Sequence, residues 1–192
     1  MTAGAQSPDA ELAAEVRAGD NAAFGALFER HGNAIYNYCF RRTASWDTAQ
    51  DLTSAVFLEA WRANRRLAIH DGSALPWLYG IATNVCRNAR RSGYRARRAM
   101  ARLPRELATH DHADDVAGRI DDERRMRDVL DVINALPASQ RDVVALVVWE
   151  GLDYAAAATA LGVPIGTVRS RLSRVRSRLS EHLATPHIQE QS

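Results

Sequence analysis

The chain of 192 residues contains no lysine, so all 25 of its basic residues are arginine. Cysteine is limited to Cys39 and Cys86, which provide neither a disulfide framework nor a set of metal ligands. Both cysteines stand in apolar helical surroundings, where a buried free thiol is expected. With 11 glycines and 6 prolines, the composition excludes a fibrous or low-complexity protein.

Long apolar runs are missing as well. No stretch approaches the roughly 18 uncharged apolar residues that cross a bilayer, and Met1–Leu12 lacks the pattern of a secretion signal. The composition, 46% hydrophobic and 25% charged, is that of a globular protein with one or two packed domains. We therefore expect a cytoplasmic protein without membrane insertion.

The formal net charge of +2 hides a strong segregation of charge along the chain. Residues 87–105 carry eight arginines and no acid, whereas residues 106–123 carry seven acids and one arginine. Five further arginines and no acid follow in residues 169–178. Two basic patches that flank an acidic connector are typical of two modules that face nucleic acid.

Hydrophobic residues recur at helical spacing almost throughout, and no segment alternates as a strand would. The predicted fold is therefore all-α, with two small helical domains joined by a flexible acidic linker. The first domain covers residues 9–98, the linker residues 99–118 and the second domain residues 119–184. Such a linker lets the domains lie close together or spread apart without breaking a core.

Turn and capping residues divide each domain into helices. The helices predicted for the first domain are 8–18, 22–32, 33–42, 47–64 and 76–93, with Asp47 as the cap of the fourth and a loop over Ala68–Leu75. Those predicted for the second domain are 119–134, 137–150, 154–161 and 165–183, with Asp153 capping the third and a turn at Gly162-Val163-Pro164.

The second domain ends in the strongest local signal, the pattern of a helix-turn-helix. Small residues over Ala155–Ala158 and the turn at Gly162 allow two helices to cross closely. We expect Val168, Leu172, Val175 and Leu179 to face inward. The outward face suits the major groove, where Arg reads guanine edges, and contains Arg169, Ser170, Ser173, Arg174 and Arg176. The alternative is a solvated basic helix in a bundle.

The helix predicted to begin at Pro76 has a second basic face. Its outer side holds Asn84, Arg87, Asn88 and Arg91, with Trp77 near its start. Arginine and asparagine beside an aromatic ring suit unpaired DNA, whose bases stack and expose their edges. The alternative is a basic solvated face with Trp77 as an ordinary core residue.

Four motifs follow one another in an order and spacing that resemble the extracytoplasmic-function (ECF) group of bacterial sigma factors. They are Asp51–Trp61, Pro76–Asn84, Leu136–Arg141 and Gly166–Leu172. The resemblance implies a subunit that binds core RNA polymerase and directs promoter-specific transcription initiation. It also implies an anti-sigma protein, wedged between the domains, that covers residues 51–62 and 169–176 together. We expect a monomer outside the holoenzyme, with no cofactor and no metal ion.

The resemblance further assigns residues to each contact. The first domain would bind the polymerase beta-prime clamp through Asp51, Ser54, Ala55, Leu58 and Arg62. It would recognise and help melt the minus-ten element through Trp77, Asn84, Arg87, Asn88 and Arg91, and its loop at 68–75 would capture a flipped base. The second domain would bind the beta flap and recognise the minus-thirty-five element through Arg169, Ser170, Ser173, Arg174 and Arg176. Gly80 stands where a basic residue is common in the family.

Two other functions compete with this interpretation. The run His110–Asp115 is similar to the HxHxD motif of metallo-hydrolases, but it lies in the predicted linker without the rigid loop and distant ligands of a zinc site. We therefore expect that this protein is not an enzyme. An ordinary helix-turn-helix regulator, whose first domain senses a ligand or dimerises, is the stronger alternative. The basic patch of residues 87–105 favours the sigma factor, because a sensor domain has no need of it.

Overall fold

The computed structural model describes the backbone of residues 9–100 and 116–184, and the side chains within residues 9–93 and 118–180. In these ranges the chain is all-α, as predicted, and an isolated bridge between His70 and Ser73 is the only strand-like pairing. Most of the predicted linker, and the whole of His110–Asp115, lie outside the described residues. None of the helices in the described ranges is long and apolar enough to cross a membrane.

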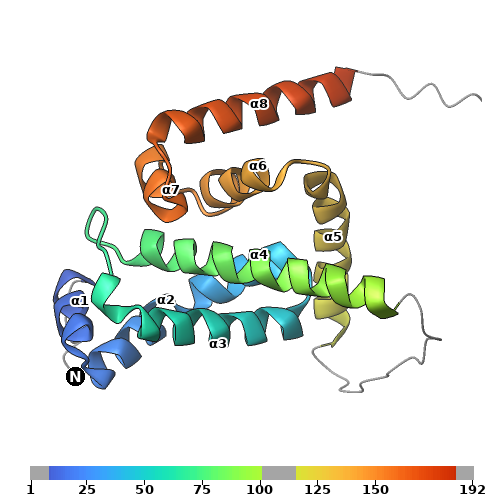
Figure 1. The fold of residues 1–192 in the computed structure, drawn as a ribbon. Helices are drawn as coiled ribbons and strands as arrows, with labels where there is room; N and C mark the ends of the chain where they lie inside the picture. Colours follow the sequence, from blue (N-terminus) through green and yellow to red (C-terminus); the bar gives the residue numbers. More distant parts are fainter. Residues whose placement is uncertain (1–8, 101–115, 185–192) are drawn as a thin grey trace, which may run out of the picture.

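The first domain contains α1 (Asp9–Ala18), α2 (Asn21–Thr43), α3 (Trp46–Arg62) and α4 (Leu75–Met100), with a 3-10 turn at Asn64–Arg66 (Figure 1). The prediction of separate helices over 22–32 and 33–42 is wrong. Gly32 costs a helix only about 1 kcal/mol, and the buried residues Leu27, His31 and Ile35 form one continuous stripe across it. The cap of α3 is Ser45 rather than Asp47, because the Ser45 side chain accepts the Thr48 N–H.

The second domain contains α5 (Val116–Asn134), α6 (Ala138–Val143), a π-helical segment (Val144–Trp149), α7 (Tyr154–Leu161) and α8 (Ile165–Ala184). Asp153 caps α7 as predicted, and Gly162 takes the left-handed φ of 63° that ends it. The helix-turn-helix is therefore confirmed. Leu179, predicted to face inward, is 37% exposed, because the inward stripe of α8 ends at Val175.

The loop of residues 67–74 is held by the buried carboxylate of Asp9. Asp9 Oδ2 accepts the Ala74 N–H at 2.8 Å and lies 2.7 Å from His31 Nε2. Asp9 Oδ1 accepts a hydrogen bond from Arg30 Nη1 at 2.5 Å. Burial raises the pKa of Asp9, but the Ala74 N–H, the Arg30 guanidinium and His31 together outweigh burial and leave the pKa below 3.8. One side chain therefore joins α1, α2 and the loop.

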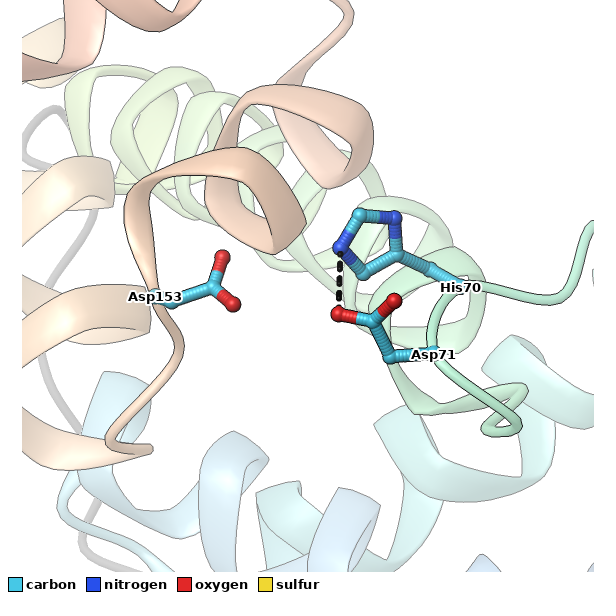
Figure 2. A group of neighbouring side chains, drawn as sticks. All are labelled: His70, Asp71 and Asp153. Carbon is cyan, nitrogen blue, oxygen red and sulfur yellow. Dashed lines mark ion pairs between the residues drawn. The ribbon is translucent and has the colours of Figure 1, made fainter.

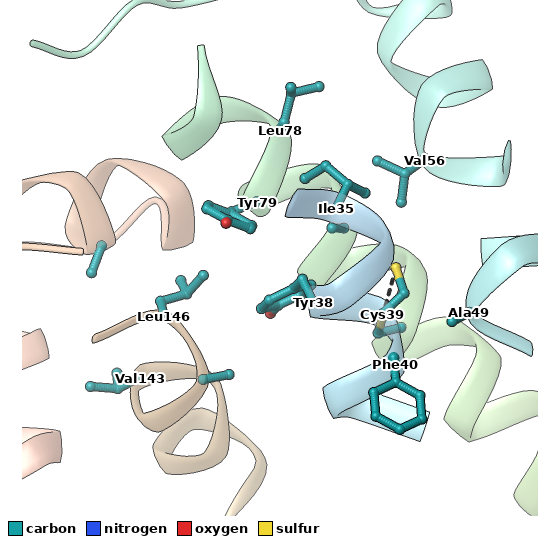
Figure 3. Packing of buried hydrophobic residues seen from close by; sticks show 14 of the residues in the cluster. Ile35, Tyr38, Cys39, Phe40, Ala49, Val56, Leu78, Tyr79, Val143 and Leu146 are labelled. Atoms are coloured by element: carbon teal, nitrogen blue, oxygen red, sulfur yellow. Dashed lines mark hydrogen bonds between the residues drawn. The ribbon is translucent and has the colours of Figure 1, made fainter. Parts of the chain in front are cut away.

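A single hydrophobic core joins the two domains (Figure 3). Tyr38 of α2 and Tyr79 of α4 share it with Val143 and Leu146 of the second domain. A smaller cluster of Leu136, Val144 and Val175 lies within the second domain alone. Spreading the domains apart would therefore expose part of the shared core, contrary to the sequence-based expectation that no core would be broken.

The two cysteines are buried free thiols, as predicted. Cys39 lies on α2 and Cys86 on α4, and their sulfur atoms are 4.0 Å apart within the shared core. The contact with Cys86 and the burial of the site raise the pKa of the Cys39 thiol above its ordinary value. The protonated thiol of Cys39 therefore behaves as a small apolar group of the packing between α2 and α4.

We predict that Asp9→Asn lowers the free energy of unfolding by about 1–3 kcal/mol at pH 7, because the buried donors around Asp9 lose a charged acceptor. The lowered pKa makes the Asp9 contribution present above pH 3.8 and lost as the pH falls through the folded-state pKa. The difference in the free energy of unfolding between variant and parent should therefore become smaller at acidic pH. Urea unfolding at pH 7 and at acidic pH measures this difference. Asp47→Asn, which removes the same charge from an exposed site, serves as the control.

Candidate nucleic-acid interface

The recognition face predicted on α8 is exposed to solvent. Val168, Leu172 and Val175 are buried against the rest of the second domain and fix the rotation of the helix. This rotation exposes all of the predicted residues, namely Arg169, Ser170, Ser173, Arg174 and Arg176. Among the described residues, the side chains of these three arginines form no hydrogen bond or ion pair with the protein. The face is thus a row of charged donors without protein acceptors.

The face predicted on α4 is different, because its central arginine is already engaged. Asn84 and Asn88 are exposed, whereas Arg87 is half-buried and donates from Nε and Nη2 to Asp142 Oδ2, at 2.9 and 2.6 Å. Trp77 is partly buried and packs against two hydrophobic clusters, so only part of its ring is open to solvent. The last residue of the predicted set, Arg91, is exposed.

The predicted polymerase-binding residues lie on α3. Asp51, Ser54, Leu58 and Arg62 are exposed and Ala55 is half-buried. Leu58 is 50% exposed, and Arg62 forms an ion pair with Glu59 at 2.6 Å. In Figure 1, α3 and α8 lie on opposite sides of the molecule, with α4, α6 and α7 between them.

The buried carboxylate of Asp142 lies in the contact surface between the two domains, which we call the seam. Asp142, Arg42 and Arg87 together are called the Asp142 clamp. Asp142 has a side chain only 1% exposed, and its Oδ1 accepts Arg42 Nη2 at 2.6 Å while its Oδ2 accepts Arg87. Each oxygen of one α6 carboxylate is therefore paired with a guanidinium of the first domain. A buried carboxylate without such partners would be strongly destabilising.

A second carboxylate with a buried side chain, that of Glu150, repeats this arrangement between the domains. Glu150 has a side chain 4% exposed and lies 3.0 Å from Arg41 Nη2. The hydroxyl of Tyr79 donates to Glu150 Oε2 at 2.8 Å. Burial and the neighbouring Glu150 carboxylate raise the pKa of Tyr79, so its hydroxyl stays a donor. Glu150 thereby joins α2 and α4 to the end of the π-helical segment.

The close approach of α4 and α7 depends on Gly80. A Cβ at this position would lie 2.5 Å from the carbonyl oxygen of Ala160, well inside van der Waals contact. A larger side chain on α4 would therefore push α7 away. Relatives are expected to carry a basic residue at this position. In this chain a basic side chain would overlap the backbone of Ala160.

The loop of the first domain also touches the second domain. His70 and Asp71 lie opposite Asp153, which stands before α7 (Figure 2). An imidazole nitrogen of His70 and a carboxylate oxygen of each aspartate all lie within 4.8 Å of one another. His70 Nε2 is 3.5 Å from Asp71 Oδ2, and Asp153 Oδ1 is occupied by the Ala156 N–H of the α7 cap. Since Asp153 is used in capping and Asp71 is exposed, we interpret the group as a polar contact across the seam.

Sequence reasoning identified the exposed faces but missed the residues of the seam. Asp142 and Glu150 stand within helical patterns as ordinary charged residues, and no periodicity separates a buried carboxylate from an exposed one. Asp142 follows the motif Leu136–Arg141 directly, and this is the one signal that pointed near it. Arg42 gave no signal, because its partner lies 100 residues away.

Comparison with known proteins now gives the family. The model for Sigma-70 region 2 matches residues 27–98, and that for Sigma-70, region 4 matches residues 126–179. The ECF RNA polymerase sigma factor SigM of Mycobacterium tuberculosis (strain H37Rv) is 33% identical over 91% of this chain and 84% of SigM. The RNA polymerase sigma-H factor of Pseudomonas aeruginosa is 31% identical over 93% of this chain and 95% of its own length. The two regions define a sigma-70-type initiation factor, and the chain belongs to the ECF RNA polymerase sigma factors.

Two solved structures are similar over most of their length. CnrH, solved with the cytosolic domain of CnrY, aligns with a TM-score of 0.64 at 26% identity, covering 91% of this chain and 96% of CnrH. The sigma factor RpoE of Bartonella quintana, co-crystallised with the anti-sigma factor NepR, aligns with a TM-score of 0.54 at 26% identity, covering 83% and 96%. The family consists of promoter-specific initiation factors that bind RNA polymerase, which replaces the alternative of an ordinary helix-turn-helix regulator.

We predict that Gly80→Ala loosens the packing of α7 on α4, because the added methyl group overlaps the Ala160 backbone. Overpacking of this kind costs about 1–3 kcal/mol. Gly93→Ala is a matched control on the same helix, since nothing lies within 4 Å of its Cβ position. That control should be neutral or stabilising by up to about 1 kcal/mol. Urea unfolding and small-angle X-ray scattering measure both, and equal stability of the two variants would show that α4 and α7 do not meet in solution.

Proposed function

We propose that this sigma factor recognises the two promoter elements with two separate faces. In this proposal α8 reads the minus-thirty-five element, and α4 with the loop of residues 67–74 recognises the minus-ten element. The outer face of α3 binds the beta-prime clamp of the polymerase, and the second domain binds the beta flap. The single observation that carries the proposal is the α8 face, whose five polar residues are all exposed opposite a buried stripe.

The assignment of α8 rests on the helix-turn-helix and on side-chain chemistry. Arg169 and Arg174 lie in the first turns of the second helix, the part of such motifs that meets base edges. A guanidinium pairs with the two acceptors of a guanine edge or with a phosphate. Ser170 and Ser173 are short, exposed hydroxyls that fit beside these contacts. The face therefore offers both sequence reading and phosphate anchoring.

Recognition of the minus-ten element by α4 requires a change at the seam. Arg87 donates two hydrogen bonds to Asp142 in this arrangement, so a phosphate or base must replace the carboxylate before Arg87 contacts DNA. The exchange keeps Arg87 paired with an acceptor, which limits its cost. We infer that the arrangement with the domains packed together is a closed form, and that minus-ten recognition through Arg87 belongs to an open form.

An anti-sigma protein is a further part of the proposal. Its support comes from the two solved relatives, one seen with the cytosolic domain of CnrY and the other with an anti-sigma factor. A partner wedged between the domains does not fit the closed form, because it would have to displace the shared core. A partner of the closed form that covers both α3 and α8 has to reach around the molecule, since these helices lie on opposite sides (Figure 1).

Run-off transcription with core RNA polymerase tests the proposed function. We predict core-dependent transcripts from a subset of a promoter library, and a loss of those transcripts in the Arg169→Ala, Arg174→Ala double variant. Each base-reading arginine should contribute about 1–3 kcal/mol and selectivity at one promoter position. Pure phosphate contacts would instead weaken all sequences alike and flatten the salt dependence.

The matched control for this double variant is Arg124→Ala, Arg125→Ala, which removes two exposed arginines from α5. It should leave promoter choice unchanged, because neither residue belongs to a predicted contact. Transcripts from the double variant on α8 at parental level and selectivity would overturn the placement of α8 in the groove. Absence of any core-dependent transcript across the library would overturn the proposed promoter recognition as a whole.

We predict that Asp142→Asn favours the open form and tightens binding of the unpaired minus-ten strand at least about fivefold. A hydrogen bond to a charged group contributes about 1.5–3 kcal/mol, and its loss at the clamp removes the competitor of the DNA for Arg87. Fluorescence anisotropy with a labelled strand measures this binding. Asp131→Asn, an exposed acid on α5, serves as the control. Unchanged affinity in Asp142→Asn would show that the clamp does not withhold Arg87 from DNA.

A further inference from the structure

The seam holds a cavity of about 810 Å³ next to the Asp142 clamp. It is lined by α2, α4 and α6, so that both domains contribute to its wall. The lining residues are Arg42, Arg87, Arg90, Arg91, Ala138, Ser139, Arg141 and Asp142. Five guanidinium groups thus face one carboxylate in a single cavity. Its volume lies within the roughly 300–1,000 Å³ range of small-molecule pockets.

The single carboxylate of this cavity cannot neutralise its arginines. Both oxygens of Asp142 are already taken by Arg42 and Arg87. Arg141 donates from Nη1 to the backbone oxygens of Leu136 and Asn134, at 2.7 and 3.2 Å, which holds the guanidinium in place without compensating its charge. Arg90 forms no hydrogen bond or ion pair among the described residues. Arg90 and Arg141 therefore bring positive charge to the cavity that no carboxylate among the described residues pairs with.

The electrostatics of Arg141 show the same excess. Burial lowers the pKa of Arg141, and the neighbouring guanidinium groups of Arg90 and Arg42 lower it further. Asp142 opposes these effects without outweighing them. Like charges held together at a partly buried site repel one another, and a bound anion would offset that repulsion. The cavity is thus built from donors that gain by taking up negative charge.

We propose that this cavity is a binding site for an oligophosphate chain, such as the one carried by a nucleotide. Guanidinium groups pair with phosphate oxygens through two parallel hydrogen bonds. A water molecule takes roughly 30 Å³ of liquid volume, so the cavity has room for several linked phosphoryl groups rather than one ion. Arg90 of α4 and Arg141 of α6 stand on different domains, and a chain of phosphoryl groups bridges them.

A small oligophosphate fits the site better than a strand of DNA does. The cavity exists only while α6 packs near α4, because its lining comes from both domains. A long strand along α4 would have to displace α6, whereas a short ligand fits into the cavity without moving α6. The ligand would bind the closed form alone and stabilise it by mass action. Oligophosphate and minus-ten DNA would then oppose each other, and the opposition is reciprocal.

Isothermal titration of the full chain with inorganic tripolyphosphate tests this site, at fixed ionic strength because screening alone changes charged contacts. We expect saturable binding to one site, weakened at least tenfold in Arg90→Gln and in Arg141→Gln. Arg124→Gln removes an equal charge from α5 and should bind as the parent does. The thermal midpoint of the parent should rise with tripolyphosphate, and that of Arg90→Gln should not. Arg90 is exposed, and its side chain has no hydrogen bond within the described part of the chain, so this variant remains informative if Arg141→Gln fails to fold.

The remaining probes identify the source of the phosphate chain. Tighter binding of ATP than of tripolyphosphate would support the site and assign it to a nucleotide, whereas equal binding would support it for the phosphate chain itself. Equal binding of orthophosphate and tripolyphosphate, or equal binding by all variants, would overturn the proposal. Binding of a short single-stranded oligonucleotide without binding of tripolyphosphate would also overturn it. The proposal rests on the closed form alone, so no promoter enters the test and a failure of promoter recognition is seen separately.

Discussion

The packing of the two domains depends on a carboxylate of α6 that lies almost completely out of water. Asp142 can be buried only because Arg42 and Arg87 reach it from α2 and α4. Separating the domains would break both ion pairs and expose apolar residues of the shared core to water. The pairing thereby also sets the relative orientation of the helices around the shared core. Glu150 repeats the constraint with Arg41 and Tyr79, so the seam is fixed at two points.

The constraint links packing to function through Arg87. One side chain belongs both to the clamp and to the predicted DNA-reading face of α4, so the two uses exclude each other. Arg169 and Arg174 on α8 carry no such restriction, because their side chains have no protein partner among the described residues. Closing the seam thus withholds one of the two proposed DNA faces and leaves the other open.

The predictability of each element follows from the range of the interaction behind it. Three local predictions are confirmed, namely the cap at Asp153, the turn at Gly162 and the buried stripe of α8 through Val175, and all depend on neighbours within one or two turns. Two other local predictions, the helix end at Gly32 and the cap at Asp47, are wrong. The α8 surface followed from the same stripe, since the exposed face is its complement. Asp9 could not be predicted, because its three partners come from residues 30, 31 and 74.

Gly80 shows the same limit from the other side. Gly80 lacks a Cβ, and this lack matters only because the Ala160 carbonyl of the other domain lies against it. The sequence shows that Gly80 differs from the residue common in the family, but it does not show which part of the chain packs against this position. The shared core was missed for this reason, since Leu146 and Tyr79 each look like the core of their own domain. Contacts between distant segments decide the seam, and helical periodicity carries no information about them.

The absence of lysine restricts how the closed form is released. Guanidinium groups keep their charge at every physiological pH, because their ordinary pKa values lie far above neutrality. Protonation therefore cannot open the clamp from the arginine side. Salt screens a buried pair far less than an exposed one, which leaves the clamp insensitive to modest changes in ionic strength. We infer that release is driven by ligands: a partner that binds the open form, or an anion that takes the place of Asp142 on Arg87, shifts the balance, and an anion enclosed by the closed form shifts it back.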